Sequence, residues 1–215
     1  MKSIRSADRF FDSYAAGFDS IYGGKATWTN RMISRLFRGS MRKRFELSIA
    51  GSQPIRQKTV LDIGCGPGHY GITMATQGAS RVVGIDFAPE MLELARKHAL
   101  DAGVNDRCEF IQVDFMKYLP GQKFDYSIVM GVMDYISAPR EFIDHVLGLT
   151  GDRAFFSFPS TQHWLALQRK IRYKFKCDLY LYSERKVKEL FDMVAPGRFA
   201  IQDLGRDYFV SVRMK

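Results

Sequence analysis

Three stretches in the first half of the chain carry residue types that could bind a nucleoside-like ligand. The first is the glycine-rich turn within Val60–Gly68, which follows a short apolar run. Glycine lets a backbone bend sharply and approach a ligand with no Cβ in the way. The next apolar run ends at Asp86, 22 positions after Gly64, where a carboxylate can accept both hydroxyls of a ribose. A third ends at Asp114 and Phe115, where the acid can accept from an exocyclic amine and the ring can pack on a purine.

Each of these features also has a structural explanation that needs no ligand. The glycine turn could simply join a strand to a helix, Asp86 could cap a helix that begins at Pro89, and Asp114 could cap a turn. Their joint occurrence favours a ligand, because open parallel sheets bind ligands beyond the carboxyl ends of their strands. Three successive strand ends with suitable chemistry therefore predict one shared site.

The elements that must position these residues form an alternation of strands and helices from Lys58 onward. Short apolar runs predict strands at Thr59–Ile63, Arg81–Ile85, Cys108–Val113, Tyr126–Met130 and Ala154–Phe158. Because these runs are apolar on both faces, they predict a parallel sheet with helices on both sides. Two further runs, Arg198–Leu204 and Tyr208–Met214, predict a terminal hairpin with at least one antiparallel strand. The fold class is therefore an open α/β sheet.

Helical patterns occupy the N-terminal part of the chain and the connections between strands. Aromatic residues recur at three- and four-residue steps near the N-terminus, and a second helix is predicted from about Thr27 to Ile49. Further helices are expected at Pro89–Ala102, Gln162–Lys176 and Ser183–Val194.

Composition limits the class of protein. The 215 residues suit one domain, and no apolar run is long enough to cross a bilayer. The N-terminus has no apolar secretory region, so a cytoplasmic location is expected. Three widely spaced cysteines and four unpaired histidines predict neither disulfides nor a metal site. The net charge of +9 favours anionic partners without choosing among them.

With these motifs in view, Thr59–Met214 resembles the class I S-adenosylmethionine-dependent methyltransferases. The resemblance implies a Rossmann-like open sheet of seven strands, mostly parallel with an antiparallel C-terminal strand. It also implies the cofactor S-adenosyl-L-methionine and a set of residues that contact it. For the methionine part of the cofactor these residues are Asp62, Gly64, Cys65, Gly66 and Gly68, and for the ribose Asp86. For the adenine they are Phe87, Met91, Asp114 and Phe115, and for the sulfonium Met130 and Gly131.

The N-terminal aromatic pattern is similar to the helical lid of small-molecule methyltransferases such as the magnesium-protoporphyrin and ubiquinone-pathway enzymes. The similar segments are Phe11–Ala15 and Phe18–Tyr22. Most of these rings are expected in the core, and Tyr14 is the one expected to touch the cofactor. We therefore predict a lid at 1–50 and a cofactor-binding methyltransferase domain at 51–215, with a helical basic insert at about 161–195. Together they form one structural unit.

Two other enzyme classes remain as alternatives. A nicotinamide-dependent oxidoreductase shares the strand, glycine turn and acid, but its Gly-x-Gly-x-x-Gly pattern needs glycine where this chain has His69. A nucleic-acid methyltransferase is disfavoured, because Met130–Tyr135 replaces the Asn/Asp-Pro-Pro-Tyr/Phe motif of enzymes that act on nucleobase amines. A nucleic-acid-binding module without small-molecule chemistry is permitted by the charge, but no recognition motif supports it.

Three residues are candidates for work on the methyl acceptor. Asp134 could act as a base and Tyr135 could orient the acceptor, because both follow the fourth strand; His163 is a second base candidate. The structural alternatives are a helix cap, a core ring and an exposed helix histidine. A carboxylate or thiolate acceptor needs no base, whereas a phenol, alcohol or ammonium must lose a proton.

Two basic segments predict an anionic acceptor, or one presented at an anionic surface. Arg31, Arg35, Arg38 and Arg42 step by four, three and four along one helix, and Gln168–Lys176 carries five cations and no acid. A small anionic molecule is the favoured acceptor. Nucleic acid and peripheral contact with an acidic membrane also satisfy the charge. The sequence does not predict the oligomeric state.

Overall fold

The computed structural model describes the backbone at 28–161 and 179–215, and side chains at 39–161 and 179–215. Helices are α2 (Trp28–Gly51), α3 (His69–Thr76), α4 (Pro89–Asp101), α5 (Pro139–Gly148) and α7 (Glu184–Val194), with short 3-10 helices η1 (Phe115–Lys117) and η2 (Met133–Tyr135). Strands are β1 (Thr59–Ile63), β2 (Arg81–Asp86), β3 (Cys108–Gln112), β4 (Phe124–Val129), β5 (Thr150–Pro159), β6 (Phe199–Asp203) and β7 (Asp207–Arg213). Tyr14 and His163 lie outside the described residues.

The strands form one seven-stranded sheet in the order β3-β2-β1-β4-β5-β7-β6, which confirms the predicted fold class. Neighbours from β3 to β5 pair in parallel, whereas β7 is antiparallel to both β5 and β6. From β1 the chain continues through β2 to β3 on one side of the sheet, and from β4 it continues to β5 on the other side. The direction of chain order therefore reverses between the neighbouring strands β1 and β4. Ligands of open α/β sheets bind at such a switch point, beyond the carboxyl ends of the strands.

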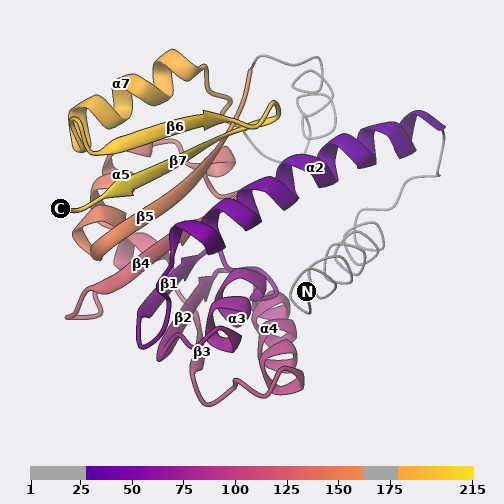
Figure 1. Cartoon of the computed structure of the whole chain (residues 1–215), viewed down its shortest axis with the longest axis vertical. Helices are drawn as coiled ribbons and strands as arrows, with labels where there is room; N and C mark the ends of the chain where they lie inside the picture. The colour runs from indigo at the N-terminus through magenta and orange to yellow at the C-terminus, as the bar shows by residue number, and fades with distance from the viewer. Residues whose placement is uncertain (1–27, 162–178) are drawn as a thin grey trace.

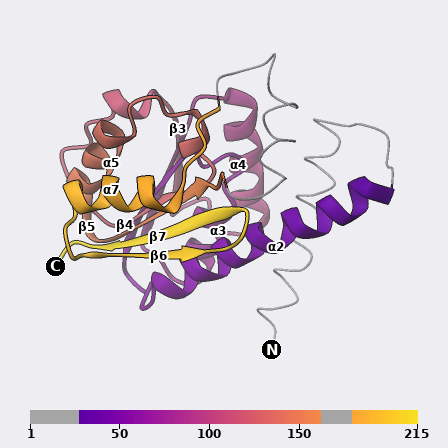
Figure 2. The ribbon, with the colours of Figure 1, turned by 90° about the horizontal axis from the view of Figure 1, so that it is seen from above.

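Helices cover both faces of the sheet, as Figures 1 and 2 show. Leu61 and Ile63 of β1 pack with side chains of α5 and α7, whereas Val60 packs with those of α3 and α4. Successive residues of a strand point to opposite faces, so a strand buried on both sides must be apolar throughout. This accounts for the unbroken apolar runs in the sequence.

Helix α2 crosses the sheet on the side of α3 and ends against β5 (Figure 1). A Cβ at Gly51 would lie 2.6 Å from Cε1 of Phe155, so only glycine fits where the helix meets the strand. Arg153 Nη1 donates to the Gly51 carbonyl at 2.6 Å and satisfies this helix end. The helix therefore runs two residues beyond the predicted Ile49. The boundary between lid and domain at 50/51 stays a prediction.

The predicted helix Gln162–Lys176 lies outside the described residues, and the other predicted elements, apart from β5, shift by at most two residues at either end. Ser183 caps α7, because its side chain accepts from the Lys186 N–H, so the helix proper begins at Glu184. Strand β5 is longer than Ala154–Phe158, since it pairs with β4 on one side and β7 on the other. No helix in the described part of the chain is long and apolar enough to cross a membrane.

Candidate cofactor site

The glycine turn follows β1 at the switch point, and its three glycines differ in what surrounds them. Gly64, Gly66 and Gly68 have φ of 66°, 50° and 81°, in the left-handed region that favours glycine. A Cβ at Gly64 would lie 2.4 Å from Val132 Cγ2, and one at Gly68 would crowd three core side chains. A Cβ at Gly66 would have open space around it. Packing thus explains two of the glycines, whereas Gly66 faces the space where a ligand could lie.

Asp86, at the end of β2, links this strand to the glycine turn by hydrogen bonds of its carboxylate. Its Oδ2 accepts from the Gly66 N–H at 2.8 Å, and its Oδ1 accepts from the Ala88 N–H at 2.9 Å. The N-cap of α4 is Ala88, so Asp86 is not the cap of that helix. Each carboxylate oxygen has a second lone pair, so the two oxygens can still accept hydrogen bonds from two hydroxyl groups. The site geometry therefore suits the ribose role predicted for Asp86.

Asp62 is buried in β1, only 2% exposed, and lies under the turn. Its Oδ2 accepts from the Gly71 N–H in the first turn of α3 at 3.1 Å. Burial raises the pKa of this carboxyl to about 7, against the opposing effect of the Gly71 hydrogen bond, and the nearby charge of Asp86 raises it further. Asp62 can therefore change its charge near neutral pH.

A cleft opens beside these residues. Helix α2 forms one wall and the glycine turn the other. Its lining residues are Met41, Arg44, Phe45, Asp62, Gly64, Cys65, Gly66, Pro67, His69, Tyr70 and Met130. The cleft thus brings together five of the predicted cofactor residues: Asp62, Gly64, Cys65, Gly66 and Met130.

Gly131 follows Met130, and its N–H donates to Ser157 Oγ at 2.8 Å. Burial raises the pKa of the Cys65 thiol, consistent with a small packing residue.

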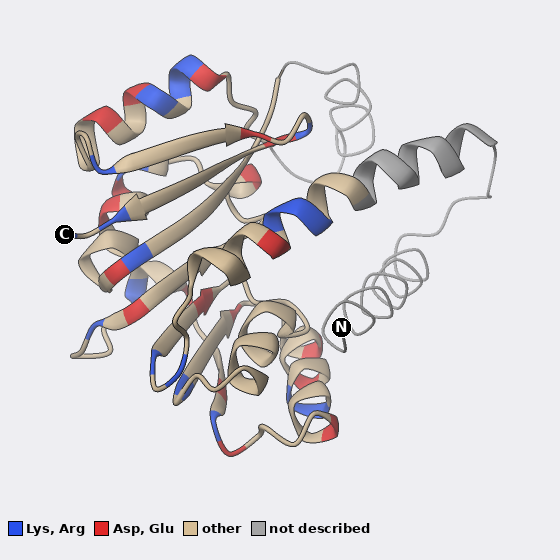
Figure 3. Cartoon of the chain, in the orientation of Figure 1, with Lys and Arg blue, Asp and Glu red and all other residues tan. Residues whose placement is uncertain are grey.

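Arg44 lines the cleft and was missed in the sequence. Its Nη1 lies 3.4 Å from Ser157 Oγ and 3.6 Å from Asp207 Oδ2. The sequence feature that could have identified Arg44 is its position on the buried face of α2, three residues after Met41 and four before the buried Ser48. Arg42, from the predicted basic stripe, is exposed and pairs with Glu46 at 2.9 Å; Figure 3 shows this charged segment of α2. The side chains of the other three stripe arginines lie outside the described part.

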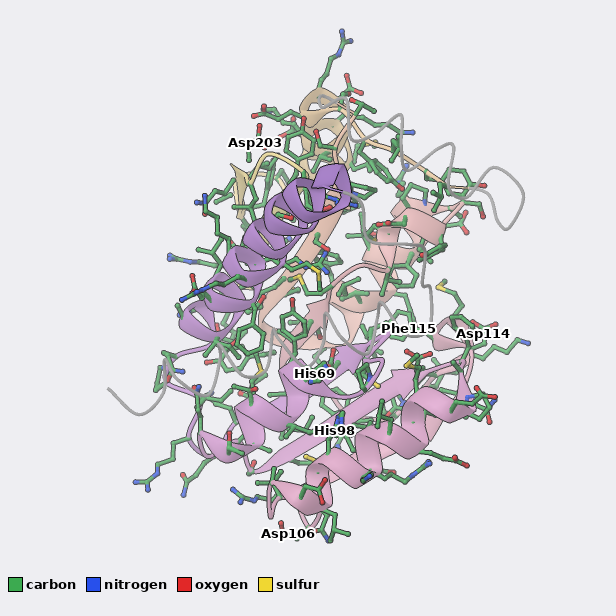
Figure 4. The ribbon with its side chains drawn as sticks, turned by 90° about the vertical axis from the view of Figure 1, so that its right-hand side faces the viewer. His69, His98, Asp106, Asp114, Phe115 and Asp203 are labelled. Atoms are coloured by element: carbon green, nitrogen blue, oxygen red, sulfur yellow. The ribbon has the colours of Figure 1, made fainter. Side chains whose placement is uncertain are left out.

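His69 and His98 lie side by side beneath the turn (Figure 4). Their rings are stacked with centroids 5.5 Å apart, and His98 Nδ1 lies 3.0 Å from the Pro67 carbonyl oxygen, a donor position. Burial lowers the pKa of His69 to about 3, with a smaller effect of His98, so His69 is neutral. The position that a dinucleotide motif reserves for glycine therefore holds a packed imidazole.

The residues predicted beside the adenine lie at the ends of β2 and β3. Phe87 is 83% exposed, and Met91 is half-buried in the first turn of α4. Asp114 is exposed and caps η1 by accepting from the Met116 N–H at 3.1 Å. The Phe115 ring packs in the core, 5.0 Å from Phe142 and 4.8 Å from His145 between centroids. The ring thus faces the core and not a purine, contrary to expectation, because η1 turns it inward; contact of the Phe115 backbone with a cofactor stays a prediction.

The predicted acceptor residues lie on η2, after β4. Asp134 is buried, and its carbonyl accepts from the Tyr180 N–H at 2.8 Å, whereas the Tyr135 ring is 50% exposed. Tyr182 donates to the Met133 carbonyl at 3.3 Å, and its pKa rises to about 12, mainly through burial and also through the charge of Asp134. Asp134 is therefore held close to two tyrosines from a distant part of the chain. Its part in catalysis stays a prediction.

Comparison with known proteins shows the family of this chain. The family model described as "Methyltransferase domain" matches residues 56–194, and the chain belongs to this family of S-adenosylmethionine-dependent methyltransferases. The ubiquinone biosynthesis O-methyltransferase of Serratia proteamaculans (strain 568) is 35% identical over 131 residues, 58% of this chain and 52% of that protein. The mitochondrial ubiquinone biosynthesis O-methyltransferase of Schizosaccharomyces pombe is 39% identical over 87 residues, 40% and 31% of the two chains.

The chain therefore spans about half the length of the first of these relatives. Among solved structures, magnesium protoporphyrin IX methyltransferase from Synechocystis PCC 6803 with bound S-adenosylhomocysteine is similar, with a TM-score of 0.69, 20% identity and 99% of each chain covered. At that identity the likeness supports the fold. Because one relative is mitochondrial by name, the predicted cytoplasmic location does not follow from the family.

Proposed function

We propose that this methyltransferase transfers the methyl group of S-adenosylmethionine to an oxygen atom of a small anionic molecule. The observation that carries the proposal is the cleft between α2 and the glycine turn, whose charges complement the cofactor. Asp86 would accept from the ribose hydroxyls, Asp62 from the ammonium group, and Arg44 would donate to the carboxylate. The adenine would lie toward Phe87 and Met91 at the ends of the neighbouring strands.

An oxygen acceptor on a small molecule is supported by the relatives, whose names specify O-methylation in ubiquinone biosynthesis. The chain matches only part of those proteins, so the acceptor has to be identified directly. We expect radiolabel from methyl-labelled S-adenosylmethionine to enter small phenols or carboxylates in a screen that also contains RNA and protein. Label that entered only RNA would overturn the proposal in favour of a nucleic-acid methyltransferase.

The chain's own residues would position the acceptor. When bound, S-adenosylmethionine supplies a methyl group made electrophilic by its sulfonium. The acceptor oxygen must lie in line with the S–CH₃ bond at about 3 Å, in a space without water. Met130 and Gly131 follow β4 at this edge of the sheet, and η2 begins two residues later. A phenol would pass its proton to Asp134 while Tyr135 orients the ring; a carboxylate would need no such step.

Asp134→Asn should lower turnover by about 10²–10⁴-fold for a phenolic acceptor while S-adenosylmethionine affinity changes little. Asparagine keeps the shape of the side chain but cannot take up a proton. Steady-state kinetics and calorimetry on the same variant test this. The matched control is Asp144→Asn, an exposed acid on α5 that should leave both quantities unchanged. Equal losses of turnover and affinity in Asp134→Asn, or neither, would favour a structural role for Asp134.

S-adenosylmethionine should bind more tightly as the pH rises from about 5.5 to about 7.5. The contact with the cofactor's ammonium group needs ionised Asp62, and burial raises the pKa of that carboxyl to about 7. The stability of the empty protein should change in the opposite direction. Because the folded-state pKa lies above the ordinary value of 3.8, the free energy of unfolding falls as the pH rises from the lower to the higher value.

Calorimetry and thermal melting at a series of pH values measure these two profiles. Asp62→Asn should flatten both, since asparagine does not titrate. If the variant keeps the pH dependence of the wild-type protein, another group is responsible, and the assignment of Asp62 to the ammonium group fails.

Reversing the charge of Arg169, Lys170 and Arg172 together should raise the KM for the acceptor by about tenfold or more and leave cofactor affinity unchanged. These residues belong to the basic segment of the predicted insert. Reversal of Lys123, Arg213 and Lys215 is the matched control, because these exposed cations lie outside the insert, at the opposite edge of the sheet, where β4 begins and β7 ends. An unchanged acceptor KM in the folded insert variant would show that the insert does not recognise the acceptor's charge.

A further inference from the structure

The first residue of β7, Asp207, reaches the cofactor cleft through Arg44. Because β7 is antiparallel, it begins at the edge of the sheet where β4 and β5 end, and Asp207 pairs in register with Pro159. Asp207 is 4% exposed, and its Oδ2 lies 3.6 Å from Arg44 Nη1. A terminal strand that contributes no residue to the lining of the cleft thus contacts one that does.

Ser157 of β5 is the second support of the Arg44 side chain. Its buried Oγ accepts from Arg44 Nη1 at 3.4 Å and from the Gly131 N–H at 2.8 Å. Arg44 Nη2 lies 3.6 Å from the place of a Cβ on Gly131, so the guanidinium lies close to the end of β4. Arg44 is therefore held between α2, the ends of β4 and β5, and the start of β7.

Arg44 supplies the positive charge of the cleft. Among the described residues that line it, Arg44 is the one permanent cation, since burial keeps His69 neutral with a pKa of about 3. The other charged lining residue is Asp62, an acid. A ligand carboxylate in this cleft therefore has Arg44 as its cationic partner.

We propose that Asp207 is a positioning residue that, with Ser157, fixes the Arg44 guanidinium for the carboxylate group of S-adenosylmethionine. A guanidinium carries five N–H donors in one rigid plane, so contacts at one Nη set the direction of the others. The long side chain of an arginine loses much rotamer freedom when it binds a ligand, unless neighbouring groups already hold it in place. Asp207 and Ser157 supply this support before the ligand arrives. The inference rests on the proposed function and extends it to the terminal hairpin.

The test compares two ligands that differ in the carboxylate alone: S-adenosylmethionine and its decarboxylated form. In Asp207→Asn the affinity for S-adenosylmethionine should fall about tenfold, the size expected for a charge-assisted contact, while the affinity for the decarboxylated ligand stays within about twofold. Asp203→Asn is the matched control. Asp203 is an exposed acid of the same hairpin, labelled in Figure 4, whose side chain accepts from the Gly205 N–H, and its loss should change neither affinity.

A second variant keeps the test decisive if Asp207→Asn does not fold. Ser157→Ala removes an acceptor for Arg44 without removing a charge, and should lower S-adenosylmethionine affinity about threefold with the same preference between ligands. Equal losses for both ligands would show a merely structural role, and no loss for either would show no role; both overturn the inference. A wild-type protein that binds neither ligand would contradict the proposed function itself, and the inference with it.

Discussion

Replacement of Asp86 by alanine should weaken S-adenosylmethionine binding by about 2–4 kcal/mol. The substitution removes the acceptor for two ribose hydroxyls. It also removes the contacts with the Gly66 and Ala88 N–H groups, at 2.8 and 2.9 Å, that hold the glycine turn against β2. The fold should survive, because Asp86 lies at the end of a strand. Isothermal titration calorimetry measures the effect directly.

Asp106→Ala is the control for the Asp86 substitution. Asp106 is an exposed acid that pairs with Arg107 at 3.6 Å, and Figure 4 shows it well below His69, the residue that follows the glycine turn. This control should bind the cofactor as the wild-type protein does. Wild-type affinity in a folded Asp86→Ala protein would mean that the ribose does not lie at the end of β2.

Gly64→Ala should destabilise the fold by about 2–4 kcal/mol and abolish measurable cofactor binding. The positive φ of 66° is strained for alanine, and the new Cβ would lie 2.4 Å from Val132 Cγ2, so the backbone or Val132 must move. Chemical denaturation gives the free energy of unfolding.

The matched substitution is Gly66→Ala in the same turn. Its φ of 50° is also positive, but open space surrounds the Cβ position, so the stability loss should be only about 1 kcal/mol. Cofactor affinity should fall in this variant too, because the new methyl enters the space assigned to the ligand. Equal stability losses in the two variants would contradict the packing that we describe around Gly64.

The parts of the site that the sequence predicted are those set by local chain geometry. A strand apolar on both faces, a glycine turn and an acid at the next strand end lie in one order along the chain. The parallel sheet brings the turn and Asp86 into contact, 2.8 Å apart. Cys65 and Met130 follow because they adjoin the same strand ends.

The residues that sequence reasoning missed or misplaced depend on packing between distant segments. The stepping cations of α2 drew attention to its exposed face, which carries Arg42. Arg44, which was not predicted, lies on the face with Met41 and Phe45 and reaches Asp207. The Phe115 ring follows an acid at a strand end, but the turn of η1 directs it to Phe142. Neither outcome is encoded in spacing alone, since each depends on which surface the element meets.

Calorimetric titration of the protein with S-adenosylmethionine and, separately, with a nicotinamide dinucleotide tests the central claim most directly. Both classes of ligand suit a glycine turn followed by an acid, but His69 occupies the position of the third dinucleotide glycine. We expect micromolar-range binding of S-adenosylmethionine and no heat of binding with the dinucleotide. Tight binding of the nicotinamide dinucleotide, with none of S-adenosylmethionine, would contradict the account.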